Sequence, residues 1–224
     1  MRALNKEMQA AITPEMAIEI LKNGNKRFVS NLKVNRDLLQ QVNETSEGQH
    51  PFAVILSCID SRTSAELIFD QGLGDIFSIR IAGNVLNEDI LGSMEFSCKI
   101  AGAKVVVVLG HTKCGAIKGA CDGVELEHLT TLLNKIKPSI VAEKKKNKVH
   151  DSSSANFREN VTKSNVEHVI DQIFVESATL SNMVENRELL IVGGIYNVNS
   201  GEVDFINQLP DSRVIEYYKR RVRL

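Results

Sequence analysis

Four short apolar runs limit the folds that this chain can adopt, because none of them alternates cleanly between apolar and polar residues. They cover residues 52–57, 76–81, 104–109 and 189–192. Apolar residues on both faces are typical of strands in a parallel sheet that helices cover on two sides. Helical patterns separate the runs, at residues 62–70, 88–101 and 115–183. This alternation predicts an α/β fold with a central, mainly parallel sheet of four strands flanked by helices.

A fifth strand is expected at the edge of this sheet. Residues 202–206 form another apolar-rich run and follow the turn Asn199-Ser200-Gly201 closely. So short a connection favours a hairpin, in which the last strand pairs antiparallel with the fourth.

The first 50 residues are expected to form an N-terminal helical arm. Thr13-Pro14-Glu15 combines a hydroxyl N-cap, a proline at the first helical position and an early acid, which predicts a helix over residues 14–30. A shorter helix is expected near residues 37–42. Residues 51–224 then form the α/β unit, and arm and unit together make a single domain.

Composition excludes several classes of partner. The net charge of -1 gives no long-range field for nucleic acid or anionic lipid, and the chain has no Trp and few aromatic residues for stacking on bases. The longest apolar run, Val105–Leu109, is far too short to span a bilayer. We therefore expect neither a nucleic-acid nor a membrane partner. The lysine- and serine-rich segment 143–156 is expected to be a solvated surface connection within the domain.

The N-terminal residues carry early charges and lack the apolar stretch of a secretory signal, so a cytoplasmic location is expected. In that reducing setting the four cysteines are expected to be metal ligands, catalytic groups or buried thiols rather than disulfides. Cys98 has apolar helical neighbours and is expected to be a buried thiol. Cys121 is expected to be a plain loop residue.

Two polar clusters follow two of the predicted strands. Cys58-Ile59-Asp60-Ser61-Arg62 comes after residues 52–57, and Gly110-His111-Thr112-Lys113-Cys114-Gly115 comes after residues 104–109. If these strands are neighbours in a parallel sheet, both clusters lie at its C-terminal edge, where α/β proteins usually have their sites. Two thiolates and an imidazole with one exchangeable position are typical of catalytic zinc, so the pattern predicts Zn²⁺ held by Cys58, His111 and Cys114. Asp60 is the candidate fourth ligand, a group that the metal can release.

Other interpretations of these motifs are weaker. Cys58-x-Asp60-x-Arg62 alone is more typical of a buried cysteine followed by a surface Asp–Arg pair, and His111-x-x-Cys114 alone is also a weak signal for a metal. The spacing Gly110-x-x-x-x-Gly115 lacks the Lys-Ser/Thr of a phosphate-binding loop, and Gly72-Leu73-Gly74 lacks the third glycine of a dinucleotide site. The chain has no Cys-x-x-Cys pair, which disfavours a thioredoxin-type redox site.

The order of these motifs resembles the beta-class carbonic anhydrases. The matching blocks are Cys58-x-Asp60-Ser61-Arg62, Arg80-x-x-Gly83-Asn84, Gly92-Ser93-x-Glu95-Phe96 and Gly110-His111-x-x-Cys114-Gly115. Residues 191–203 are similar to the closing strand and turn of that family, and the resemblance extends from about residue 14 to about residue 208. It implies zinc ligation by the two cysteines and the histidine, with an Asp60–Arg62 dyad beside the metal.

The resemblance also implies an obligate dimer, or a tetramer built as a dimer of dimers, with the arm as a dimer contact and the active site near the subunit interface. Gln49, Phe77, Ala82 and Phe96 match positions that bind substrate in the family, and Gln49 is expected to approach from the partner subunit. Phe96 replaces a tyrosine of some relatives, so one hydroxyl contact is absent. The backbone around Gly115 is expected to help hold a substrate oxygen.

The implied reaction is the hydration of carbon dioxide to bicarbonate, in which zinc-bound hydroxide attacks CO2 while the dyad orients it. Two alternatives stay open: hydrolysis of carbon disulfide or carbonyl sulfide on the same scaffold, and a non-enzymatic zinc or thiol sensor. In one branch of the family, bicarbonate in a pocket of tryptophan, arginine and tyrosine favours a closed site with the aspartate on zinc. Here Arg80 and Tyr196 match, but Ile55 replaces the tryptophan, so we expect this switch to be absent.

Overall fold

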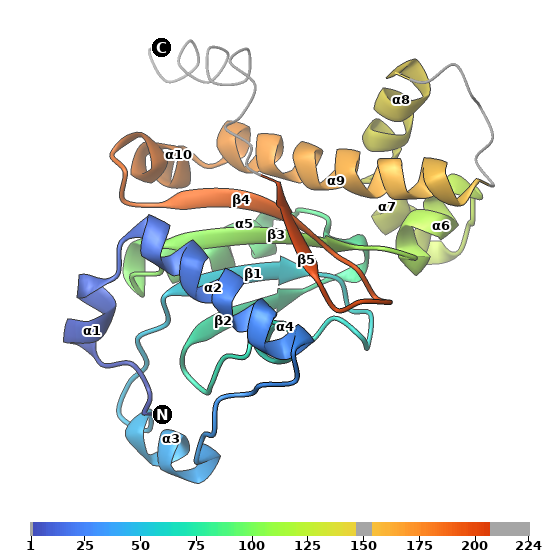
Figure 1. Ribbon diagram of the computed structural model, residues 1–224. Coiled ribbons are helices and arrows are strands. Elements are labelled where there is room, and N and C mark those ends of the chain that lie inside the picture. The colour runs from blue at the N-terminus through green and yellow to red at the C-terminus, as the bar shows by residue number, and fades with distance from the viewer. Residues whose placement is uncertain (1, 147–153, 207–224) are drawn as a thin grey trace.

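The computed structural model describes residues 2–146 and 154–206. The strands are β1 (Ala53–Ser57), β2 (Ile76–Arg80), β3 (Val105–His111), β4 (Leu190–Tyr196) and β5 (Val203–Ile206). They form one sheet in the order β2-β1-β3-β4-β5, in which β1 to β4 are parallel and β5 is antiparallel to β4 (Figure 1). The predicted fold class is therefore confirmed, including the antiparallel edge strand.

The helices cover both faces of this sheet. They are α1 (Lys6–Ala11), α2 (Pro14–Val29), α3 (Leu38–Glu44), α4 (Ala65–Ile68), α5 (Glu88–Glu95), α6 (Gly115–Cys121), α7 (Glu127–Asn134), α8 (Lys137–Lys146), α9 (Ala155–Glu176) and α10 (Ala178–Glu185). A 3-10 turn covers Ala82–Asn84, and a π-helix covers Phe96–Ile100. No helix among the described residues is both long and apolar enough to cross a membrane.

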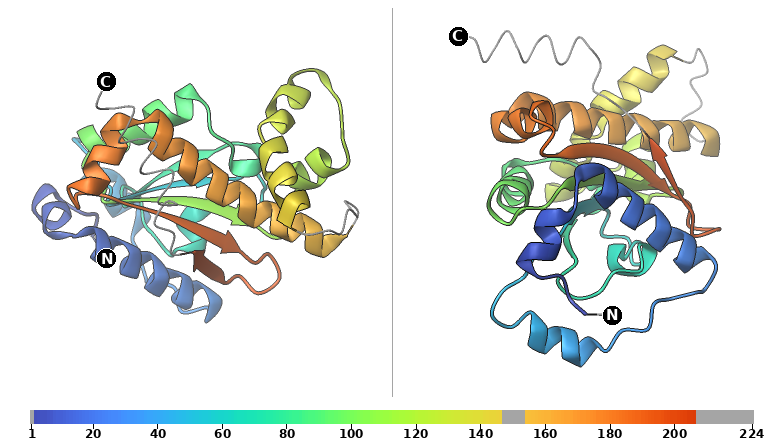
Figure 2. Two further views of the ribbon diagram at one scale, coloured as in Figure 1. Left: turned by 90° about the horizontal axis from the view of Figure 1, so that it is seen from above. Right: turned by 60° about the vertical axis from the view of Figure 1, so that its left-hand side comes forward.

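Two apolar layers hold the sheet between helices. On one face Val106 and Val108 pack against α5, α9 and α10, and on the other Val105 and Val107 pack against α2 and α4. Figure 2 shows α2 and α9 on opposite sides of the sheet. Gly193 lets α9 lie directly on β4, because a Cβ there would come within 2.7 Å of Val166.

Several helix boundaries differ from the prediction. Helix α2 begins where expected, with the Thr13 hydroxyl accepting the Met16 N–H, and α3 matches the short predicted helix. The predicted helix 62–70 shrinks to α4, and the helix 88–101 continues beyond α5 as the π-helix. The single region 115–183 is in fact divided into α6 to α10. Helix α1 was not expected. Part of the predicted connection 143–156 and the C-terminal part of the α/β unit lie outside the described residues.

Candidate metal centre

The parallel pairing of β1 with β3 brings the two polar clusters together. Ser57, the last residue of β1, pairs with Leu109 of β3. Cys58 therefore comes directly after β1, beside the end of β3, whose last residue is His111. Cys114 is the N-cap residue of α6, three positions further along. All three side chains are buried, and their ligand atoms lie within 4.8 Å of one another. The sheet therefore assembles two sulfurs and one imidazole at its C-terminal edge.

The ring of His111 is oriented for metal binding. Its Nδ1 lies 3.0 Å from the carbonyl oxygen of Thr112, which can only accept, so Nδ1 carries the hydrogen and Nε2 a lone pair. That Nε2 is buried and finds no hydrogen-bond partner among the described residues. A buried polar atom without a partner is costly, and a metal ion between it and the two sulfurs would satisfy it. These residues thus fit a metal ion.

The two thiols influence each other's ionisation. Hydrogen bonding from Cys114 lowers the pKa of Cys58, and the same hydrogen bond raises the pKa of Cys114, because Cys114 would have to give up the bonded proton to ionise. A divalent cation would favour both thiolates. The N–H of Gly83 also donates to the Cys58 sulfur at 3.4 Å. This amide comes from a turn with a φ of 69°, a conformation that favours glycine.

The other two cysteines lie outside this cluster. Burial raises the pKa of Cys98 to about 12, so it is an inert thiol, as predicted. Cys121 is the last residue of α6 rather than a loop residue, and its side chain packs against the apolar cluster under α6.

Asp60 and Arg62 form a bidentate pair beside the cluster. The Nε and Nη2 of Arg62 donate to the two carboxylate oxygens at 2.9 and 2.8 Å, and the backbone N–H of Arg62 adds a third bond at 3.0 Å. These bonds from Arg62 hold the pKa of Asp60 well below its usual range. One carboxylate oxygen lies 4.0 Å from His111 Nε2. A fixed negative charge therefore faces the place where the three ligand atoms converge.

Residues that the sequence did not single out for the site support its backbone. The hydroxyl of Thr63 donates to the carbonyl of Cys58 at 3.0 Å, and Asn165 on α9 donates to the carbonyl of Gly83 at 2.9 Å. Arg80, which the resemblance matched to the bicarbonate pocket, also donates to the carbonyls of Cys58 and Asp60, at 3.1 and 2.6 Å. Sequence patterns could not find Thr63 or Asn165 because both act through main-chain carbonyls.

A cavity of about 480 Å³ opens beside the cluster and contains part of the predicted substrate pocket. Cys58, Asp60, Ala82 and Gly115 lie on its wall, and the rest of the lining is mainly apolar. Gln49, Phe77 and Phe96 are not among the lining residues. Gln49 is exposed ahead of β1, and the rings of Phe77 and Phe96 pack edge to face, with centroids 6.3 Å apart.

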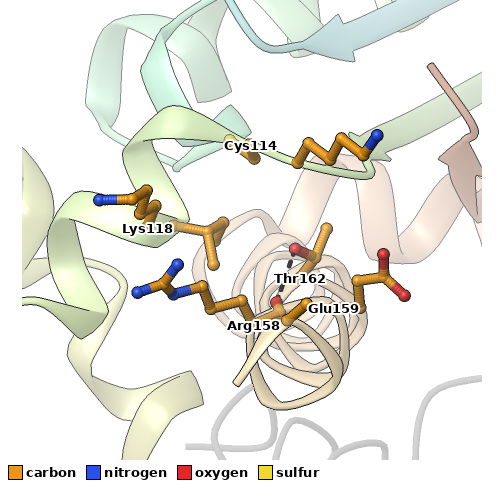
Figure 3. A pocket seen from close by; sticks show the side chains of 8 residues that line it. Cys114, Lys118, Arg158, Glu159 and Thr162 are labelled. Atoms are coloured by element: carbon orange, nitrogen blue, oxygen red, sulfur yellow. Dashed lines mark hydrogen bonds between the residues drawn. The ribbon is translucent and has the colours of Figure 1, made fainter. Parts of the chain in front are cut away.

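A smaller cavity of about 170 Å³ lies between α6 and α9, and Cys114 forms part of its wall (Figure 3). Lys118 and Arg158 lie side by side at one end of it, with Glu159 at the other. Both cations donate to Asp122 at 2.7 Å, one to each carboxylate oxygen. The carboxylate at the C-terminal end of α6 therefore partly neutralises both positive charges.

Comparison with known proteins identifies relatives of this chain. The family model for carbonic anhydrase matches residues 53–203. The carbonic anhydrase of Mycolicibacterium smegmatis is 30% identical over 88% of this chain and 96% of its own length, and carbonic anhydrase 2 of Mycobacterium tuberculosis is 31% identical over 84% and 90%. Among solved structures, the beta-carbonic anhydrase CafA of Aspergillus fumigatus has a TM-score of 0.70 at 24% identity, covering 80% of this chain and 86% of its own.

Proposed function

We propose that this chain, which belongs to the carbonic anhydrase family and has the fold of its beta class, catalyses the reversible hydration of carbon dioxide at a zinc ion. The observation that carries the proposal is the convergence of Cys58, His111 and Cys114, whose ligand atoms lie within 4.8 Å of one another beside a carboxylate. When bound, zinc would act as a Lewis acid that lowers the pKa of water toward about 7.

The dyad orients the reactants in this proposal. Asp60 stays ionised because Arg62 donates to both of its oxygens, so it can accept a hydrogen bond from the nucleophile but cannot donate one. Since both carboxylate oxygens are engaged by Arg62, we propose that Asp60 rests off the metal and leaves the fourth position to solvent. A purely structural zinc site would need neither residue, which favours an enzyme over a sensor.

Carbon dioxide would occupy the cavity of about 480 Å³, whose wall includes Ala82 and Gly115. The backbone around Gly115 would help hold a substrate oxygen. Gln49, Phe77 and Phe96 do not line the cavity of their own chain. We propose that they complete the cavity of a partner subunit, and that residues 1–50 contact that partner as an arm on the α/β unit 51–224.

Zinc content and stopped-flow hydration of CO2 test the proposal. Wild type should contain about one zinc per chain, as the three-ligand set requires. Cys58→Ala and His111→Ala should lose both metal and activity, whereas Cys98→Ala, which removes a buried thiol outside the cluster, should keep both. Full hydration activity in metal-free His111→Ala would refute the proposal. Turnover of carbonyl sulfide or carbon disulfide without CO2 hydration would favour the alternative hydrolase.

A further inference from the structure

Thr112 lies between the ligands His111 and Cys114, and three of its polar groups are engaged. Its carbonyl accepts the Nδ1–H of His111 at 3.0 Å, and its N–H donates to the carbonyl of Tyr196 at 2.9 Å. Its hydroxyl oxygen accepts the N–H of Val198 at 3.1 Å. Thr112, whose carbonyl orients the His111 ring, is therefore hydrogen-bonded twice to the β4–β5 hairpin.

The tip of this hairpin is itself held from two directions. The ammonium group of Lys113 donates to the side-chain oxygen of Asn199 at 2.9 Å. On the opposite side Asn25, a buried residue of α2, donates to the carbonyl of Gly201 and accepts the N–H of Val203, both at 2.9 Å. The hairpin thus connects the ligand loop to a helix of the scaffold.

The ligand loop needs such support because its backbone is strained. Lys113 has a φ of 55°, in the left-handed region that residues other than glycine seldom adopt. Strained residues of this kind persist only where their surroundings fix them. Here Thr112 is anchored on one side of Lys113, and Asn199 holds the Lys113 side chain.

We propose that Thr112 is a positioning residue for the metal centre, because its hydroxyl ties the carbonyl that orients His111 to the β4–β5 hairpin. The carbonyl bond keeps the hydrogen on Nδ1 and directs the Nε2 lone pair toward the two sulfurs. Without the hydroxyl, residue 112 loses one of its two hydrogen bonds to the hairpin, so its carbonyl can shift and the His111 ring can turn. This inference rests on the proposed function, since it requires the three-ligand set to bind metal.

The test compares zinc affinity, by competition with a chromophoric chelator, in three variants of the full chain. Thr112→Val keeps the shape of the side chain but cannot accept the Val198 N–H, so zinc affinity should fall by about 10-fold or more, as is typical when an outer-shell partner of a metal ligand is lost. Thr112→Ser retains the hydroxyl and should bind zinc as wild type does. Thr13→Val removes a comparable hydroxyl, which accepts the Met16 N–H at 3.2 Å, far from the site. It should leave zinc affinity unchanged.

A spectroscopic reading separates positioning from general stability. With cobalt in place of zinc, the visible absorption bands of Thr112→Val should shift, while those of Thr112→Ser and Thr13→Val should match wild type. Asn199→Ala, at an exposed position, gives a second measurement if Thr112→Val does not fold, and should weaken zinc binding in the same direction. Unchanged zinc affinity and cobalt spectra in a folded Thr112→Val protein would overturn the inference, as would unchanged values in Asn199→Ala where Thr112→Val does not fold. Failure of wild type to bind zinc would instead overturn the proposed function, and this inference with it.

Discussion

Individual residues of the site depend on neighbours that fix their protonation. The Thr112 carbonyl puts the hydrogen of His111 on Nδ1, and Arg62 keeps Asp60 ionised. Hydrogen bonding with Cys114 lowers the pKa of Cys58. Each of these effects prepares a group either to bind a cation or to accept a hydrogen bond. The site is therefore preorganised by contacts within one chain.

The carboxylate of Asp60 provides the first test at this scale. Asp60→Asn keeps the shape of the side chain and removes its charge, so the protein should retain zinc while its CO2 hydration rate falls by about 10²- to 10³-fold, the usual cost of losing one preorganised hydrogen-bonding group in an active site. Stopped-flow rates and metal analysis of the same samples measure both. Asp122→Asn is the control, because the Asp122 carboxylate is also hydrogen-bonded to cationic side chains, those of Lys118 and Arg158, but lies at the far end of α6. Equal hydration rates in wild type and Asp60→Asn would show that the carboxylate takes no part in the chemistry.

Ile55 leads to a prediction about regulation. It is fully buried in β1, and the Nε and Nη2 donors of Arg80 are engaged by the carbonyls of Cys58 and Asp60. In the bicarbonate pocket of some relatives a tryptophan occupies the position of Ile55, and an isoleucine cannot donate the hydrogen bond of its indole N–H. Losing such a bond to a charged ligand costs about 1.5–3 kcal/mol, which lowers the affinity for bicarbonate roughly ten- to a hundredfold. We therefore expect the hydration rate to rise with pH as a single ionisation, with or without added bicarbonate.

The measurement is one pH–rate curve recorded twice, in buffer alone and with bicarbonate at a concentration held constant across the curve. The two curves should share one midpoint and a slope of one proton. A steep, multi-proton profile with cooperative inhibition by bicarbonate would mean that the switch operates without its tryptophan.

At the scale of secondary-structure elements, an ion cluster fastens the segment between α2 and α3 to the end of α4. Arg27 on α2 and Arg36 before α3 each donate to Asp70 at 2.6 Å, and the N–H of Val34 donates to the same carboxylate. Asp70 and Arg36 are buried, and Arg27 is about one-third exposed. Although burial alone would raise the pKa of Asp70, the two arginines lower it below its usual value.

Asp70→Asn should therefore destabilise the protein by about 3 kcal/mol at neutral pH, because it leaves two guanidinium groups without their charged partner. Since the pKa of Asp70 is lower in the folded protein, its stabilisation is complete above the unfolded-state value of about 4 and is lost as the pH falls through the folded-state value. Urea unfolding of both proteins between neutral and acid pH should show the difference shrinking in acid. A constant difference across this range would contradict the assigned role of the ion cluster.

The strands were predictable and some of the helices were not, for physical reasons. Runs such as Val105–Leu109 are buried on both faces, so their composition alone identifies them. Outside the polar segment 143–156, the region 115–183 carries apolar residues in every part, and its other breaks depend on turns such as those before α7 and α8. Helix α1 is held by Gln9, whose amide donates to the carbonyls of Pro51 and Ala101, contacts that no local pattern encodes.

The residues of the candidate site also fall into those that could be predicted from the sequence and those that could not. Cys58, His111 and Cys114 could be predicted because rare residue types follow two adjacent strands. The roles of Thr112 and Asn165 could not, because each acts through a backbone carbonyl that folding brings close.

The molecule as a whole presents an apolar surface around one edge of the sheet. Strand β2 is the edge strand on the side of β1, and Phe96 and Ile100 of the neighbouring π-helix are 54% and 73% exposed. Phe77 of β2 packs on Phe96. Exposed apolar residues beside an open strand edge are typical of a protein interface. This surface also carries two of the residues that were expected to line the substrate pocket.

We therefore expect the protein to be a dimer or tetramer in which Phe96 of one subunit serves the site of the other. Phe96→Ser should shift the sedimentation coefficient toward that of a monomer of 24.8 kDa. Its hydration activity should fall because the cavity of each chain then lacks the partner's side chains, whereas its zinc content should stay at the wild-type level, since all three proposed ligands come from one chain. Val141→Ser is the matched control: Val141 is 51% exposed, but it lies on α8, among the helices that cover the metal end of the sheet. This control should keep both its assembly and its activity. A monomeric Phe96→Ser protein with full activity would show that each chain has a complete site, and that the exposed ring of Phe96 serves assembly alone.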